Sequence, residues 1–148
     1  MLLHINRIDY TRADMLGWPL HILETDCVHF PNPTPWYQLP TVGLATLEET
    51  TERDKGIMLY NVKLTARLCG TRLDLPRAPL SFRLYTASGE QFLLGLDHTP
   101  HPLTLLHLTT TENAADPSVY SLEVTHKADW PLPRIIDASG HPLSFNAE

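Results

Sequence analysis

The chain has 148 residues, of which 43% are hydrophobic and 19% charged. This length forms one ordinary domain and this apolar content can build a core, which excludes a disordered acidic tail and a coiled coil. The net charge of −6 and the lack of a run of four basic residues disfavour binding to nucleic-acid phosphates. Thirteen prolines against seven glycines predict many interrupted elements, which favours short strands over long helices.

The N-terminal segment predicts a first strand over Leu2–Ile8, because apolar side chains alternate there. A short helical turn follows at residues 14–19, ended by Gly17 and Pro19, and His21–Leu23 is a candidate short strand. The segment has no basic and apolar leader, and no stretch approaches 18 apolar residues. We therefore expect no membrane partner, and a protein located in the cytoplasm or in a phage-like particle assembled there.

Residues 30–40 contain four prolines and three aromatic side chains, namely Phe30, Trp36 and Tyr37. Proline fixes φ, removes a backbone donor and extends the preceding residue, so an extended loop or arm is expected here, partly in the polyproline II conformation. Trp and Tyr are enriched at interface hot spots, so these three residues are candidates for contact with a neighbouring subunit. Alternatively, the segment folds over one end of its own sheet.

A β-hairpin is predicted from two alternating stretches, 42–51 and 58–68. The second stretch places Met58, Tyr60, Val62, Leu64, Ala66 and Leu68 on one face. A polar turn over residues 52–56 joins the two strands. Carboxylates gather towards this end of the hairpin, and Glu48, Glu49 and Glu52 are candidate interaction residues. The ordinary alternative for such a run is a solvated turn.

The second half of the chain continues this series of short strands. Leu80–Thr86 and Gln91–Leu96 flank a turn in which Gly89 can adopt positive φ, which predicts a second hairpin. Further strands are expected at 103–111, 119–126 and 134–137, with a last edge at 142–145. No three-turn amphipathic helix and no linker is visible. The sequence therefore predicts a single all-β domain over residues 1–148, an antiparallel β-sandwich or small β-barrel of about seven to nine short strands.

The chain contains eight histidines, so we consider whether some of them could bind a metal ion. The only ligand set that the spacing offers combines Cys27 and His29 with His98 and His101, and these four are weak candidates because nothing in the sequence brings them together. There is no nucleophile elbow, phosphate-binding loop or EF-hand pattern. We therefore predict no catalytic residue and no cofactor.

Three stretches of the second half carry a resemblance: Leu84-Tyr-Thr-Ala-Ser-Gly-Glu-Gln-Phe-Leu-Leu-Gly, His98-Thr-Pro-His-Pro-Leu and Val119-Tyr-Ser-Leu-Glu-Val-Thr-His-Lys-Ala-Asp-Trp-Pro-Leu. The order of hairpin, proline corner, Thr-rich strand and closing Trp-Pro resembles a group of small phage and prophage structural proteins of Bacteroidetes. The resemblance covers about residues 84–136 and implies a role in virion or tail assembly, with no active site.

Three functions follow for testing. The first is a non-enzymatic structural or assembly protein, phage- or prophage-derived, that acts through protein–protein contacts as a homo-oligomer or with virion or tail components. The second is a β-barrel or sandwich that binds a small ligand. The third is a metal-dependent enzyme that uses the Cys27, His29, His98 and His101 set.

Overall fold

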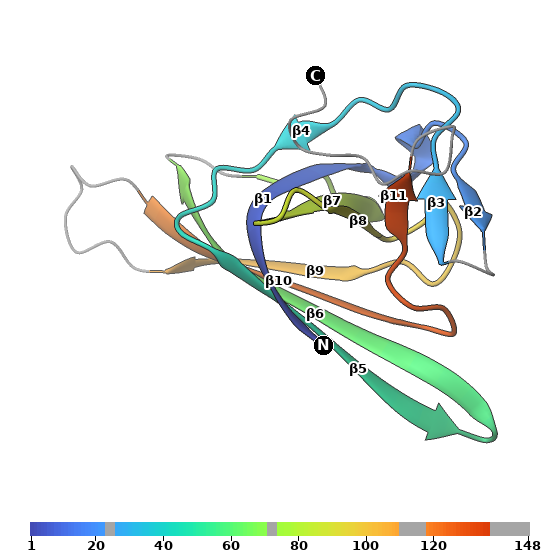
Figure 1. Cartoon of the computed structure of the whole chain (residues 1–148). Helices are drawn as coiled ribbons and strands as arrows, with labels where there is room; N and C mark the ends of the chain where they lie inside the picture. The colour runs from blue at the N-terminus through green and yellow to red at the C-terminus, as the bar shows by residue number, and fades with distance from the viewer. Residues whose placement is uncertain (23–25, 71–73, 110–117, 137–148) are drawn as a thin grey trace.

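The computed structural model describes residues 1–22, 26–70, 74–109 and 118–136, and β-strands are the main regular structure of these residues (Figure 1). The all-β prediction is confirmed. A 3₁₀ turn, η1, is the helical element of this part of the chain, and no helix there could cross a membrane. The elements are β1 (Leu2–Arg12), η1 (Ala13–Met15), β2 (Leu20–Ile22), β3 (Cys27–His29), β4 (Tyr37–Gln38), β5 (Ala45–Asp54), β6 (Ile57–Gly70), β7 (Leu80–Thr86), β8 (Gln91–Leu94), β9 (Leu103–Thr109), β10 (Ser118–Ala128) and β11 (Arg134–Ile136).

The eleven strands belong to one open sheet in the order β2-β3-β11-β8-β7-β1-β5-β6-β10-β9, with β4 paired to β1. The sheet is mixed, because β3 and β11 run parallel while the other paired strands are antiparallel. The predicted sandwich or barrel is therefore not confirmed, and seven to nine strands is too low a number. The strands β3 and β4 are too short to produce a recognisable alternation. The edge predicted at 142–145 lies outside the described residues.

The bent strand β1 joins the two halves of the sheet. Its first residues, Leu2–Ile5, pair with β5, and Ile5–Arg12 pair with β7 on the other side. The register shifts between Ile5 and Arg7, an irregularity of the kind that bends a strand and increases its twist. Where β5 leaves β1, β4 takes its place opposite Asp9 and Tyr10. As Figure 1 shows, β1 curves away from β5 and towards β7.

The main core lies between these two halves. Val62, Leu64, Ala66 and Leu68 of β6 are buried in one cluster with residues of β1, β7 and β8 such as Phe82. The alternation predicted for β6 is thus confirmed over 62–68. The sheet also buries part of its other face, where a second cluster contains Val28, Leu93, Leu96 and Ile135. Strands β7 and β8 therefore have apolar neighbours on both faces, as expected for the centre of a sheet.

Both predicted hairpins are present. Strands β7 and β8 pair from Phe82↔Leu94 to Tyr85↔Gln91, and Gly89 in their turn has φ +91°. The β5–β6 hairpin is longer and closes at Asp54↔Ile57. Its two central residues, Lys55 and Gly56, have φ of +50° and +79°, the sign pattern of a type I′ turn. The turn therefore consists of Lys55 and Gly56 and is shorter than the predicted 52–56, because strand pairing continues to Asp54 and Ile57.

Candidate interaction site

The β5–β6 hairpin extends beyond the strands that flank it (Figure 1). On one side, β10 pairs with β6 only as far as Ala128↔Tyr60. On the other side, β1 pairs with β5 only as far as Leu2↔Glu48, and the Met1 carbonyl accepts one more bond from the Glu49 amide. Residues 50–59 are called here the projecting hairpin. Thr50 and Thr51 pair with Asn61 and Tyr60, where β10 still flanks β6, and among the described residues the part from 52 to 59 pairs only with itself.

The projecting hairpin exposes apolar side chains on both faces. Ile57 is 55% exposed and lies opposite Asp54, while Met58 is 38% exposed and lies opposite Arg53 on the other face. Successive residues of a strand point to opposite faces, so the two apolar side chains cannot cover one another. A two-stranded hairpin is marginally stable in water, and its unpaired edges are templates for another strand.

Charges of both signs follow one another at the tip, in the order Glu52, Arg53, Asp54, Lys55. Glu52 is the residue of this run farthest from the turn, and its carboxylate accepts hydrogen bonds from Lys127 and from Asn61 Nδ2, the latter at 3.2 Å. These bonds, from Lys127 first, lower the pKa of Glu52, and the same contact with Glu52 raises the pKa of Lys127. The predicted interaction residue Glu52 is thus engaged with its own sheet, whereas Arg53, Asp54 and Lys55 project outward.

Glu48 and Glu49 point to opposite faces of β5. Glu48 is exposed opposite Lys63 on the outer face. Glu49 faces inward beside Val62, where its Oε2 accepts a hydrogen bond of 2.8 Å from the Leu132 amide. Glu49 therefore ties β5 to the segment before β11, and the acidic cluster expected from the sequence is divided between two faces. The exposed apolar side chains of the hairpin, Ile57 and Met58, lie beside the tip charges Arg53, Asp54 and Lys55.

The proline-rich segment 30–40 lies on its own sheet (Figure 1). The Leu39 side chain is buried in the main core, and its amide donates to the Ile8 carbonyl at 2.9 Å. Just beyond, the Val42 amide donates to the Arg67 carbonyl at 2.7 Å. The segment thus connects β1 with β6. Of the alternatives left open by the sequence, the structure has the loop folded over its own sheet.

The three aromatic residues of this segment differ in exposure. Phe30 and Trp36 pack edge to face, with ring centroids 6.2 Å apart, against the second core cluster. Tyr37 packs on Tyr10 at 5.7 Å and is 58% exposed. Phe30 and Trp36 are therefore occupied within the chain, and Tyr37 retains most of its surface for a partner.

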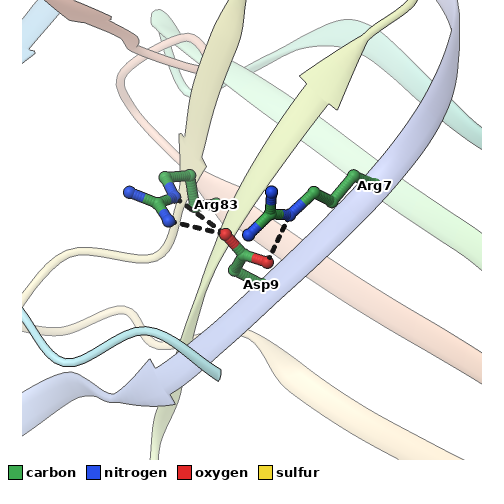
Figure 2. Close-up of polar contacts among 3 residues, drawn as sticks. All are labelled: Arg7, Asp9 and Arg83. Atoms are coloured by element: carbon green, nitrogen blue, oxygen red, sulfur yellow. Dashed lines mark hydrogen bonds and ion pairs between the residues drawn. The ribbon is translucent and has the colours of Figure 1, made fainter. Parts of the chain in front are cut away.

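A buried carboxylate is held by two arginines, as Figure 2 shows. Asp9 of β1 is 1% exposed, and its Oδ1 accepts a bond of 3.0 Å from Arg7 Nε. Its Oδ2 accepts from Arg83 Nη2 at 2.6 Å and from Arg83 Nε at 3.1 Å. The Arg83 guanidinium also lies 4.9 Å from the Trp36 ring centroid, a cation–π distance. This cluster anchors the proline-rich segment through Trp36.

The four weak metal candidates are not brought into a metal site. Cys27 and His29 lie on β3, and His29 Nδ1 is 3.3 Å from the Ile136 carbonyl. His98 and His101 lie between β8 and β9, with His98 Nδ1 3.2 Å from an Asp97 oxygen. Across the described part of the chain, no group of three or more His, Cys, Asp or Glu side chains could hold a metal ion.

Sequence reasoning missed a ring cluster around Trp130. The centroid of its ring lies 6.0 Å from that of His21, 5.5 Å from that of His98 and 5.9 Å from that of His126. These histidines come from β2, the β8–β9 connection and β10, so no local spacing could have revealed the cluster. The high histidine count was the one available signal.

Comparisons of the chain with protein-family models, with curated proteins and with solved structures found no match.

Proposed function

We propose that this chain is a non-enzymatic structural or assembly protein that binds further copies of itself through the projecting hairpin. The observation that carries the proposal is that residues 50–59 extend past both flanking strands and expose Ile57 and Met58. An unsupported hairpin with free edges and apolar faces gains stability when a partner covers it. The resemblance over residues 84–136 supports a phage-like assembly.

The charges at the tip favour a second copy as the partner. Arg53 and Asp54 make the tip self-complementary when two such hairpins meet antiparallel, because Arg53 of each copy can then face Asp54 of the other. A two-fold contact of this kind is the commonest arrangement in homo-oligomers. Tyr37, exposed on β4, and the two sheet edges β2 and β9 offer further surface for virion or tail components.

The proposal is tested by measuring the solution mass by light scattering at micromolar concentrations. We expect the wild type to exceed the 16.7 kDa of one chain. The double variant Ile57→Asp/Met58→Asp should return to the mass of one chain, because four like charges would then meet in a two-fold contact. Leu44→Asp is the matched control, since Leu44 is 61% exposed outside the hairpin. A wild type that is monomeric and joins no larger particle would contradict the proposal.

A further inference from the structure

A hollow of about 660 Å³ lies beside the base of the projecting hairpin, in the size range of small-molecule sites. Its lining comes from four parts of the chain. Tyr60 belongs to β6, His21 to β2, and His98 to the β8–β9 connection, while Trp130 follows β10. The hollow therefore exists only in the folded chain, between the hairpin and the β2 end of the sheet.

Aromatic rings form much of this lining. Trp130 and Tyr60 are both half-buried, so each keeps part of its ring surface available. His98 packs beside Trp130 at 5.5 Å and His21 meets it edge-on at 6.0 Å, which fixes the orientation of the indole. The faces of Trp and Tyr rings carry partial negative charge and attract cations, with Trp the strongest.

The charged groups of the hollow have one sign. Asp26 and Asp129 line it, and no Lys or Arg is among the described residues that do so. A third carboxylate, Asp97, contacts His98, with an oxygen 3.2 Å from Nδ1. Burial, the largest effect, lowers the pKa of His21. The charge of Asp26 raises this pKa, and His98 lowers it further. The lowered pKa keeps the His21 ring uncharged at neutral pH, so it does not repel a cation.

We propose that this hollow binds an organic ammonium ion, with the cationic head against Trp130 and Tyr60 and its charge balanced by Asp26 and Asp129. The rings of Trp130 and Tyr60 supply cation–π attraction, and the two carboxylates supply long-range Coulomb attraction. A neutral ligand of the same shape would gain neither of these. The shared chemistry is a substituted ammonium, whether on a small molecule or on a lysine side chain. This site does not depend on the proposed self-association, and its ligand can bind a monomer.

The test is calorimetric titration of the full chain with choline and with 3,3-dimethylbutan-1-ol, which has the same shape without the charge. Choline should bind at least about tenfold more tightly, the effect of about 1.4 kcal/mol of cation–π and Coulomb attraction. Nα-acetyl-lysine amide forms a second arm: affinity above that of choline assigns a lysine side chain, and lower affinity assigns a quaternary ammonium. Equal affinity for choline and the alcohol, or no binding of choline, would overturn the proposal.

Variants separate the site from a general effect of charge. Asp129→Asn should weaken choline binding several-fold, and since Asp129 is exposed this variant should fold. Asp14→Asn removes the same charge from η1, which does not line the hollow, and should leave the affinity unchanged. Equal weakening by the two variants would mean that choline senses only the net charge, and would overturn the site. Trp130→Leu should abolish choline binding, provided that this variant still unfolds cooperatively on heating and is therefore folded. If Trp130→Leu does not fold, the comparison of Asp129→Asn with Asp14→Asn tests the site.

Discussion

Arg83 of β7 holds the buried carboxylate of Asp9 of β1 with two donors, Nη2 at 2.6 Å and Nε at 3.1 Å. Asp9 and Arg83 lie directly opposite one another in the antiparallel pairing of β1 with β7. The proline-rich segment packs on this part of the sheet. Because the same guanidinium lies over Trp36, one side chain links the strand pairing to the packing of that segment. Removal of Arg83 would take two donors from the desolvated Asp9 carboxylate, although Arg7 would still contact it.

Arg83→Met should therefore destabilise the fold by about 3 kcal/mol, the lower end of the cost of breaking a buried ion pair. Chemical denaturation followed by circular dichroism measures the change in the free energy of unfolding. Arg12→Met is the control, because it breaks the exposed Arg12–Asp14 pair and should cost no more than about 0.5 kcal/mol. Equal costs for the two variants would show that the Asp9 cluster contributes no more than a surface pair.

The proline-rich segment should be displaced by Gly17→Ala. The Gly17 amide donates to Thr34 Oγ1 at 2.8 Å, and a Cβ at this position would collide with the Asn32 backbone carbonyl. The segment would have to move, and Trp36 would lose part of its packing on Phe30 and Arg83. We expect a red shift of tryptophan emission and a loss of about 1–3 kcal/mol of stability.

Gly70→Ala is the matched control for this change, because a Cβ at Gly70 meets nothing within 4 Å. Its emission spectrum and stability should stay close to those of the wild type. If Gly17→Ala leaves the emission of the protein unchanged, the close contact between Gly17 and the segment does not hold in solution.

The stability of the protein should fall as the pH decreases below about 6.5, in part because of His126. Burial lowers the pKa of His126, opposed by its hydrogen bond to the Pro100 carbonyl and assisted by His101. The unfolded chain then takes up a proton that the folded chain excludes, so unfolding is favoured as the pH falls below the unfolded pKa. The loss of folding stability grows as the pH falls further, until the pH reaches the pKa of His126 in the folded chain.

His126→Gln should reduce this pH dependence, since the amide can still donate to the Pro100 carbonyl but does not titrate. His107→Gln, on the exposed surface of β9, should leave the dependence unchanged. The measurement is the unfolding midpoint of each protein at pH 7.5 and pH 5. Identical pH dependence in His126→Gln and the wild type would contradict the role given to burial.

Long alternating strands were predictable from the sequence, and elements defined by their partners were not. β7 has the predicted bounds of Leu80–Thr86, and β6 follows its predicted alternation over residues 62–68, where it buries one face. β3 has three residues and exists through its pairing with β2 and β11, which lie on either side of it. Such a strand is stabilised by neighbours distant in the sequence, so local propensity carries little information about it.

The candidate sites show the same division. The hairpin was predictable, because its turn and both strands are contiguous in the sequence. Its projection beyond β10 was not, because that depends on where β10, a strand distant in the sequence, ends its pairing, at Ala128↔Tyr60. The Trp130 cluster likewise needs three separate segments to meet. Glu49 was predicted as an interaction residue from its acidic neighbours, yet the alternation of β5 turns it inward to Leu132.

The most direct test of the proposed assembly is hydrogen exchange of the projecting hairpin at two protein concentrations. Amides of residues 51–58 lie at exposed positions and should exchange rapidly in a single chain. If the hairpin joins copies of the chain, their exchange should slow at high micromolar concentration and quicken on dilution, while amides of Leu64 and Phe82 in the core stay protected throughout. Exchange of residues 51–58 at the same rapid rate at both concentrations would contradict self-association through the hairpin.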